Sequence, residues 1–216
     1  SARQIFLMPA PDVYEEGEID PFIDNDPISR GVPPGILYAT DRKPAEADDK
    51  KYDHYTHERG FALRLGKADI VMGRNPDITW EEARRLSLLK NRTDKFPLQV
   101  GEVEEFGVLA ETVRPFDRFE QDDVAKTRFI DEIDQRLATS DRKDVYVYVH
   151  GYKVNFENPL LVAAELWHFL GYNGAFVAYS WPTKYSVFAY LSDLDSAVNS
   201  ARNLRKLLVQ IALHTD

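Results

Sequence analysis

The segment "VYVYVHGYKVNF" (residues 145–156) decides how the rest of the chain is interpreted. Its first five residues are apolar or aromatic without alternation, as in a strand buried on both faces of a parallel sheet. A helical pattern follows over residues 158–171, and a second apolar run follows over residues 174–181. Strand, helix and strand in this order form a βαβ unit. The turn after the first strand holds His150, Gly151 and Tyr152.

This turn lies where open parallel sheets bind ligands, beyond the carboxyl ends of the strands. Gly151 has no Cβ, so we expect the backbone to bend there without a clash. With that bend, the main-chain N–H of Tyr152 can point into a cleft and not into the strand ladder. An N–H in this position can stabilise an oxyanion, and losing such a donor costs roughly 3–4 kcal/mol of activation free energy.

Composition limits the possible partners. The chain has 216 residues, of which 44% are hydrophobic, which is enough for a sizeable α/β core. The net charge of −9 disfavours nucleic acid and anionic membranes as partners. No apolar run approaches the ~20 residues of a membrane span. Cysteine is absent, which excludes disulfides, thiol nucleophiles and cysteine metal sites.

The first part of the chain predicts an arm followed by strands. Residues 1–35 are rich in Pro, Gly and Asp, which predicts an extended N-terminal arm across the surface. We expect a charged loop at residues 43–60 and a break near Gly66. The ranges with strand character are 35–42, 61–73 and 103–116.

Three further helices are expected outside the βαβ unit, at residues 79–90, 122–140 and 192–216. The first of them begins with a capping signal. Thr79 and Glu82 have capping-box spacing at the start of residues 79–90. The expected inner face of helix 122–140 holds Val124, Phe129, Ile133 and Leu137. Helix 192–216 is expected to open at Ser192. Its expected apolar stripe holds Leu194, Val198, Ala201, Leu204, Leu208 and Ile211.

Three motifs occur in a characteristic order. They are "YATDR" (38–42), "VYVHGYKVNFEN" (147–158) and "AYSWPTKYSVFAYLSDLDSA" (178–197). Together they resemble the α/β-hydrolase superfamily, and more narrowly a bacterial α/β-hydrolase family of uncharacterised function. In that superfamily, His-Gly after a strand is the oxyanion-loop signature. The order and spacing match from about residue 36 to the end of the sequence.

The resemblance implies an α/β fold with a parallel sheet, mixed at its edge and flanked by helices. It also implies a serine hydrolase that acts on esters. The nucleophile of such enzymes lies in a G-x-S-x-G elbow on the next strand, and this sequence contains no such elbow. We therefore expect residues 36–216 to be the N-terminal half of the hydrolase domain, truncated before the nucleophile strand. The catalytic serine, acid and histidine would lie elsewhere.

By resemblance, the chain supplies the oxyanion half of a carboxyl-ester hydrolase. The N–H of Tyr152 would bind the oxyanion beside Gly151, and His150 would shape the turn by hydrogen bonding. Ser180 and Trp181 would line the acyl pocket, although packing in the core explains these two residues equally well. No cofactor or metal is implied. The expected partners are a small-molecule ester and a complementary polypeptide that carries the G-x-S-x-G half.

Other interpretations remain open. The chain could be a hydrolase-like scaffold without a nucleophile that serves as a binding or interaction module. The His-Gly turn could also belong to another kind of α/β protein. Asp53, His54, His57 and Glu58 could form a metal site, but a solvated loop fits them better. His168 and His214 fit a core boundary and a helix end. The sequence identifies no cellular compartment. The resemblance favours export, because members of the resembled family often carry leader peptides.

Overall fold

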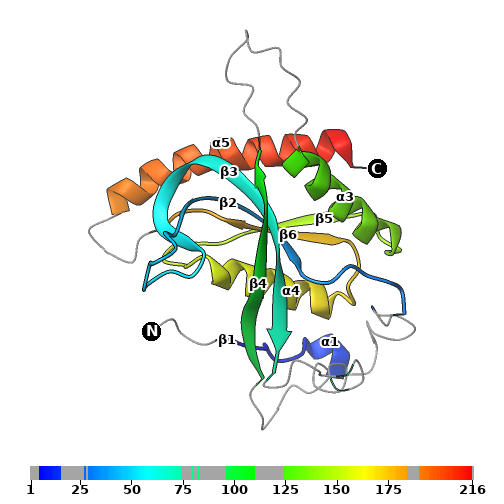
Figure 1. The fold of residues 1–216 in the computed structure, drawn as a ribbon. Helices are drawn as coiled ribbons and strands as arrows, with labels where there is room; N and C mark the ends of the chain where they lie inside the picture. The colour runs from blue at the N-terminus through cyan, green and yellow to red at the C-terminus, as the bar shows by residue number, and fades with distance from the viewer. Residues whose placement is uncertain are drawn as a thin grey trace.

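The computed structural model describes residues 5–15, 27, 29–73, 79, 82, 96–109, 124–183 and 190–215. In these residues a mixed sheet lies between helices on both of its faces (Figure 1). The strand order is β1-β4-β3-β2-β6-β5. The strands are β1 (Ile5–Phe6), β2 (Ile36–Pro44), β3 (Tyr55–Met72), β4 (Pro97–Val108), β5 (Val145–Val149) and β6 (Ala175–Ser180). The helices are α1 (Asp12–Glu15), α3 (Val124–Ala138), α4 (Glu157–Phe169) and α5 (Tyr190–His214). The expected α/β class is confirmed.

The parallel part of the sheet is the βαβ unit together with β2. Strand β6 pairs in parallel with β2 on one side and with β5 on the other. Helix α4 connects β5 to β6 and ends near Gly171, whose φ of 65° is left-handed and suits glycine. Strand β5 is an edge strand among the described residues.

The antiparallel part of the sheet is longer than the sequence suggested. Strand β3 runs without a break through Gly66, where the pairing with β4 shifts register. A Cβ at Gly66 would lie 2.5 Å from the ring of Tyr38, so glycine permits this close approach. The expected break at Gly66 and the charged loop over all of residues 43–60 are therefore wrong. Pairs such as Pro44↔Tyr55 extend the ladder into the charged segment, because backbone pairing does not require apolar side chains.

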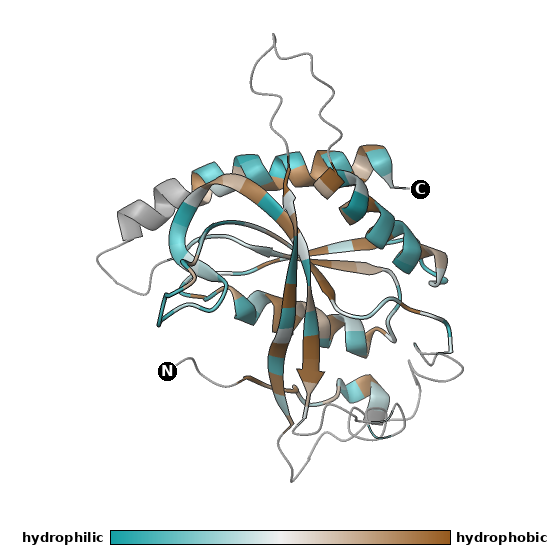
Figure 2. Ribbon diagram, in the orientation of Figure 1, coloured by the Kyte–Doolittle hydropathy of each residue, from teal (hydrophilic) through white to brown (hydrophobic). Residues whose placement is uncertain are grey.

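The core has one cluster on each face of the sheet. On one face, β2 and β6 pack against α3 and α5 through residues such as Leu37 and Val177. On the other face, Tyr38 and Ala178 pack against Leu160 of α4. The strands at the centre of the sheet are accordingly hydrophobic on both faces, and the helices carry both hydrophobic and hydrophilic residues (Figure 2). This arrangement buries the sheet centre and leaves the strand ends available for a site.

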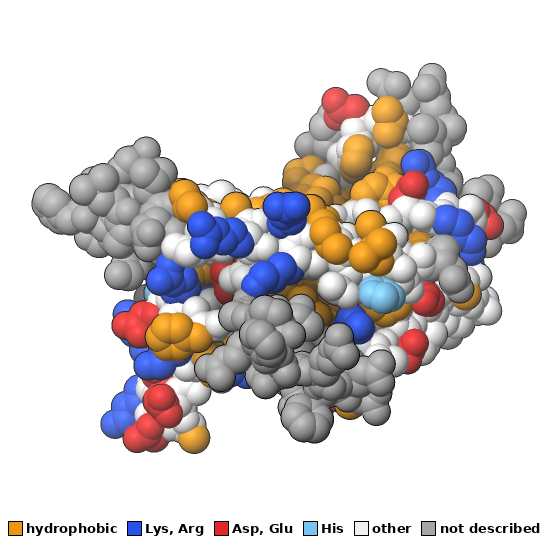
Figure 3. Space-filling model, turned by 90° about the horizontal axis from the view of Figure 1, so that it is seen from above, with side chains coloured by type: hydrophobic (Ala, Val, Ile, Leu, Met, Phe, Trp, Pro, Cys, Tyr) orange, Lys and Arg blue, Asp and Glu red, His pale blue; other side chains and the backbone are white. Residues whose placement is uncertain are grey.

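The two long helices differ in part from the expected faces. Val124 is 67% exposed, whereas Phe129 and Ile133 of α3 are buried. Helix α5 begins at Tyr190 and not at Ser192. On α5, Leu207 and Ile211 are buried, whereas the expected inward residues Val198, Ala201 and Leu208 are exposed. Hydrophobic side chains therefore share the outer face of α5 with Lys and Arg (Figure 3).

The described part of the N-terminal arm packs on β4 and α4. Strand β1 pairs with β4, and Leu7 is buried. The N–H of Met8 donates to Glu165 Oε1 at 2.7 Å, and the hydroxyl of Tyr14 donates to the carbonyl of Phe169. The arm thus contributes an edge strand and covers one end of α4.

Some expectations fall largely outside the described residues. Thr79 and Glu82 make the reciprocal capping hydrogen bonds, at 3.3 and 3.1 Å. The remainder of the predicted helix 79–90 lies outside the described residues, as do residues 110–116 of the expected strand and residues 184–189 of the third motif. None of the helices in the described ranges combines the length and apolar character needed to cross a bilayer.

Candidate active site

The ends of β5 and β6 bring two predicted motifs together. The pairing of these strands ends at Val149↔Tyr179. His150 and Trp181 follow at the same edge of the sheet. Because the two strands are parallel, their carboxyl ends lie at the same edge of the sheet, which is the edge where open α/β sheets bind ligands.

His150 and Trp181 fasten the two strand ends to each other. Their rings are stacked with centroids 5.4 Å apart and planes at 10°. The indole Nε1–H of Trp181 donates to the carbonyl of His150 at 2.8 Å. The Nε2 atom of His150 lies 3.1 Å from the carbonyl oxygen of Trp181. This reciprocal contact fixes the position of the turn, and no spacing rule in the sequence predicts it.

The electrostatic setting keeps the His150 ring neutral. Burial lowers its pKa to about 4, with help from the positive charge of Arg42, although the carbonyls of Gly151 and Trp181 act in the opposite direction. The Nδ1 atom lies 2.7 Å from the Gly151 carbonyl oxygen. A neutral ring has one N–H, so it donates to one of these two carbonyls. A group with this pKa is poorly suited to general-base work near neutral pH.

The surroundings of Gly151 differ from those expected. Its φ is not left-handed, and a Cβ at this position would meet nothing within 4 Å. The expected reason for glycine, relief of a Cβ clash at the bend, is therefore wrong. The left-handed residue of the turn is Lys153, with φ of 59°. Gly151 instead borders open space at the strand ends.

Tyr152 lies outside the strand ladder. It occupies a bend beyond the last β5–β6 pair, and it is 39% exposed. The ammonium of Lys153 lies 5.8 Å from the centroid of the Tyr152 ring. The position of Tyr152 is compatible with the predicted use of its main-chain N–H, and the role itself stays a prediction.

Ser180 and Trp181 occupy different environments. Ser180 is fully buried, and its hydroxyl accepts from Arg42 Nε at 3.0 Å and donates to the Phe156 carbonyl at 3.4 Å. These contacts favour the core interpretation for Ser180. Trp181 is partly exposed beside the turn, so it can border a ligand as well as pack.

Arg42 gathers the segments around the turn, and the sequence analysis did not single it out. Its buried guanidinium donates to the carbonyls of Val154 at 2.7 Å and Thr56 at 3.2 Å. Together with the bond to Ser180, it joins β2, β3, β6 and the loop after the turn. The one sequence signal was its place in "YATDR".

Asp41 makes the corresponding connection on the opposite face of β2. Its Oδ2 accepts from the Ser200 hydroxyl at 2.7 Å and from Asn203 Nδ2 at 3.0 Å. These bonds hold α5 against the carboxyl end of β2. Adjacent residues of one motif therefore brace both faces of the same strand end.

The residues of the alternative metal site are used in other ways. The Nδ1 atom of His57 lies 3.3 Å from Arg42 Nη1, where it can accept a hydrogen bond. The ring of His54 packs 6.2 Å from that of Phe156. Within the part of the chain that the structure describes, no three His, Asp or Glu side chains are grouped to hold a metal.

A mixed sheet with flanking helices, and a His-Gly turn at the carboxyl end of a parallel strand, define a hydrolase-like α/β scaffold. Residues 125–216 match the model of a family described as alpha/beta hydrolase of unknown function (DUF900). The match confirms, for this part of the chain, the resemblance to an α/β-hydrolase family of uncharacterised function. No curated protein and no solved structure matches the chain.

Proposed function

We propose that this chain is the oxyanion-hole half of a serine hydrolase that cleaves carboxyl esters. The main-chain N–H of Tyr152 donates to the oxyanion, and Gly151 leaves room for the acyl carbon. His150 is a positioning residue that acts through the turn. The observation that carries the proposal is the reciprocal contact of His150 with Trp181, which holds the turn beside open space.

Trp181 forms one wall of the acyl site in this proposal. It is partly exposed, and its indole plane lies parallel to the His150 ring. Ser180 supports the turn indirectly. Its buried hydroxyl accepts a hydrogen bond from Arg42, and Arg42 donates another to the Val154 carbonyl in the loop after the turn. Displacing either residue would move the turn relative to the ester.

The nucleophile is supplied by a complementary polypeptide or by a segment outside these 216 residues. Support comes from β5, which is apolar along its whole length, is only partly buried, and is an edge strand among the described residues. An apolar edge strand with one open side is a template for another strand. A nucleophile strand paired there would place its serine next to the His-Gly turn.

The chemistry follows the general scheme of serine hydrolases. The serine, activated by a histidine, attacks the ester carbonyl and forms a tetrahedral intermediate. The N–H of Tyr152 and the N–H after the serine bind the negative oxygen. Collapse of the intermediate releases the alcohol, and water then releases the acid.

Labelling with a fluorophosphonate probe tests the proposal. The natural gene product and residues 1–216 alone are each incubated with the probe, and labelled peptides are identified by mass spectrometry. We expect a labelled serine only when the complementary segment is present. Labelling within residues 1–216 would contradict the location of the nucleophile.

If the natural gene product stays unlabelled and hydrolyses no ester, the hydrolase proposal fails. The alternative of a nucleophile-less binding scaffold then holds. A matched control is the same preparation heated before it is labelled. Heating unfolds the site, so any labelling that remains does not depend on the folded protein.

A further inference from the structure

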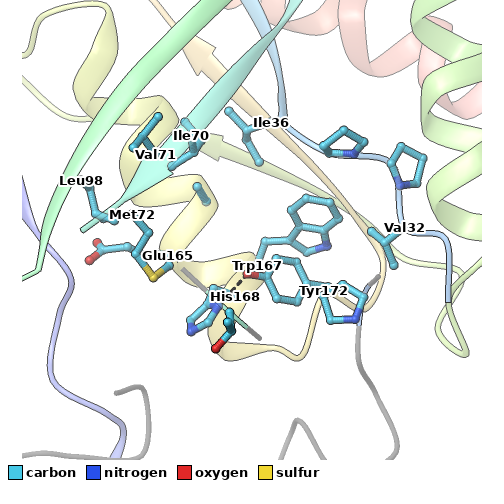
Figure 4. Close-up of a pocket in the computed structure, with 16 residues that line it drawn as sticks. Val32, Ile36, Ile70, Val71, Met72, Leu98, Glu165, Trp167, His168 and Tyr172 are labelled. Carbon is cyan, nitrogen blue, oxygen red and sulfur yellow. Dashed lines mark hydrogen bonds between the residues drawn. The ribbon is translucent and has the colours of Figure 1, made fainter. Parts of the chain in front are cut away.

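A cavity opens beside the last turns of α4, at the end of the sheet that lies away from the His-Gly turn. Its volume is about 330 Å³, which falls at the lower end of small-molecule sites. It is lined by residues 32–36 before and at the start of β2, by residues 70–72 at the end of β3, and by α4 (Figure 4). The turn precedes the first residues of α4, so the helix separates the two sites by roughly 15–20 Å.

Most of the described lining is hydrocarbon. Ile70 and Met72 of β3 and Leu98 of β4 line the side formed by the strands. Trp167 and Tyr172 line another side, with ring centroids 5.1 Å apart and planes at 71°. The flexible thioether of Met72 can adapt its shape to an apolar group and makes favourable contacts with aromatic rings. Such a lining favours a compact apolar ligand.

The rings on the cavity wall already use polar atoms within the chain. The indole N–H of Trp167 donates to the carbonyl of Gly174 at 3.1 Å. The Nδ1 atom of His168 lies at hydrogen-bond distance, 2.7 Å, from the Tyr172 hydroxyl (Figure 4). Trp167 and Tyr172 therefore offer the cavity the carbon surface of their rings.

The other polar side chains on the wall are engaged as well. Glu165 Oε1 accepts from the Met8 N–H at 2.7 Å, and the Thr79 hydroxyl accepts from the Glu82 N–H at 3.1 Å. Every polar side chain among the described lining residues thus has a partner in the protein. A polar ligand would compete with these bonds, whereas an apolar ligand leaves them intact.

The surroundings of the cavity also disfavour an ion of either sign. Arg30 donates to the carbonyls of Gly171 and Tyr172, both at 3.1 Å, so a cation already lies at the negative end of the α4 dipole. The guanidinium of Arg136 lies 5.8 Å from the centroid of the Trp167 ring. A further cation would be added to these two, and an anion would meet no Lys or Arg among the described lining residues. Either ion would lose hydration for little return.

We propose that this cavity binds a compact, uncharged apolar molecule of one or two rings, which lies between Met72 and the Trp167–Tyr172 pair. An apolar cavity of about 150 Å³ is large enough to bind benzene, so a molecule of this size fits. Its affinity comes from the apolar surface that both partners remove from water. The site is separate from the His-Gly turn, so the proposal stands or falls independently of ester cleavage.

Methionine-methyl NMR tests the site on the full chain. The chain has two methionines, and Met72 lines the cavity. The probes are ethylbenzene, phenethylammonium and phenylacetate, which share a phenyl ring with a short arm and differ in charge. We expect ethylbenzene to shift the Met72 methyl signal saturably, with a Kd of about 1 mM or lower. Both ions should bind at least about tenfold more weakly. No shift with ethylbenzene, or an ion that binds as tightly, would overturn the proposal.

Two variants alter the cavity from different sides. Ala164→Leu fills part of it from α4 and should weaken ethylbenzene binding by about tenfold or more. Val32→Asp places a carboxyl group on the wall before β2 and keeps the main-chain N–H that donates to the Pro27 carbonyl at 2.9 Å. It should also weaken ethylbenzene binding by about tenfold, because the new group needs water where the ligand would lie.

The matched control is Ala212→Leu, which places a leucine at an exposed position of α5. It should leave ethylbenzene binding unchanged. Because Ala164→Leu can disturb folding, its circular dichroism is compared with that of the control, and Val32→Asp decides the outcome if it unfolds. The comparison of the three probes on the unaltered chain depends on neither variant. Unchanged ethylbenzene binding in either folded variant would place the ligand elsewhere and contradict the proposal.

Discussion

The two ends of β2 are each held by a buried arginine, and the two arginines are used differently. At the amino end, Arg136 of α3 donates to the carbonyls of Pro34 and Gly35 at 3.0 and 3.2 Å. At the carboxyl end, Arg42 donates to the carbonyls of Thr56 and Val154. Both side chains are almost inaccessible to solvent.

The difference lies in what surrounds the charge. Arg136 forms an ion pair with Glu132, and Glu132 also pairs with Lys67 at 3.0 Å. Arg42 bonds main-chain carbonyls and the Ser180 hydroxyl, and its charge helps to lower the pKa of His150. Arg136 therefore anchors helix α3 at the amino end of β2, whereas burial and the charge of Arg42 lower the pKa of His150 at the carboxyl end.

Removing Arg42 should have the largest effect. Arg42→Met leaves several buried acceptors without their donor, and we expect a loss of about 3–5 kcal/mol in unfolding free energy. Arg136→Met should cost less, about 2–3 kcal/mol, because Glu132 retains Lys67. Urea unfolding at pH 7 measures both. A larger loss for Arg136→Met would reverse the comparison.

His150 should make stability depend on pH. Its folded pKa of about 4 lies below the unfolded value of 6.5, so the unfolded chain binds the proton first as pH falls. Its contribution is complete above pH 6.5 and declines toward pH 4, by about 3 kcal/mol. Denaturation curves of wild type and His150→Gln between these pH values give the difference. If the unfolding free energies of the two proteins changed equally with pH, the surroundings of His150 would not be lowering its pKa.

Gly151→Val separates the site from the fold. The new side chain enters open space, so unfolding free energy should change by less than about 0.5 kcal/mol. If this space holds the ester, hydrolysis by the natural gene product should fall by about 100-fold or more, which corresponds to about 2.7 kcal/mol. Gly101→Ala is the control, because its Cβ would make only ordinary contacts. Full activity of Gly151→Val would remove the turn from the site.

Lys67→Met tests the ion pairs at the other end of β2. Burial opposes ionisation of Glu132, but hydrogen bonds from Arg136 and Lys67 lower its pKa. A lowered pKa stabilises the fold above the unfolded value of about 4.5, and this stability is lost in more acidic solution. The variant should lose about 1 kcal/mol at pH 7 and show a weaker acid dependence than wild type. If the variant and wild type lost stability equally in acid, Lys67 would not be what lowers the pKa of Glu132.

Tyr152→Ala should have the smallest effect. The proposed donor is the main-chain N–H, which the substitution keeps, and the side chain is 39% exposed. We expect less than about a threefold change in ester hydrolysis, or about 0.6 kcal/mol. A complete loss in steady-state kinetics would instead assign the function to the ring or the hydroxyl.

Much of the fold followed from local patterns. The unbroken apolar run before His150 and the helix between Pro159 and Gly171 predicted the βαβ unit, because a buried strand and the two ends of a helix each leave a local signal in the sequence. Strand β3 was harder to predict, because residues 57–62 of its charged first half extend the ladder with β2 although none of them is buried. The inner face of α5 was misassigned because several apolar residues of that helix point outward.

The sequence by itself determined the βαβ unit, the His-Gly turn after its first strand, and the resemblance to a hydrolase half. Those features depend on neighbouring residues and on motif spacing. Only the tertiary structure decided that His150 and Trp181 hold each other, that Arg42 joins four segments, and that a cavity opens beside Trp167. Each of these joins residues that are distant in the chain, and side-chain packing selects such contacts without leaving a periodic signal.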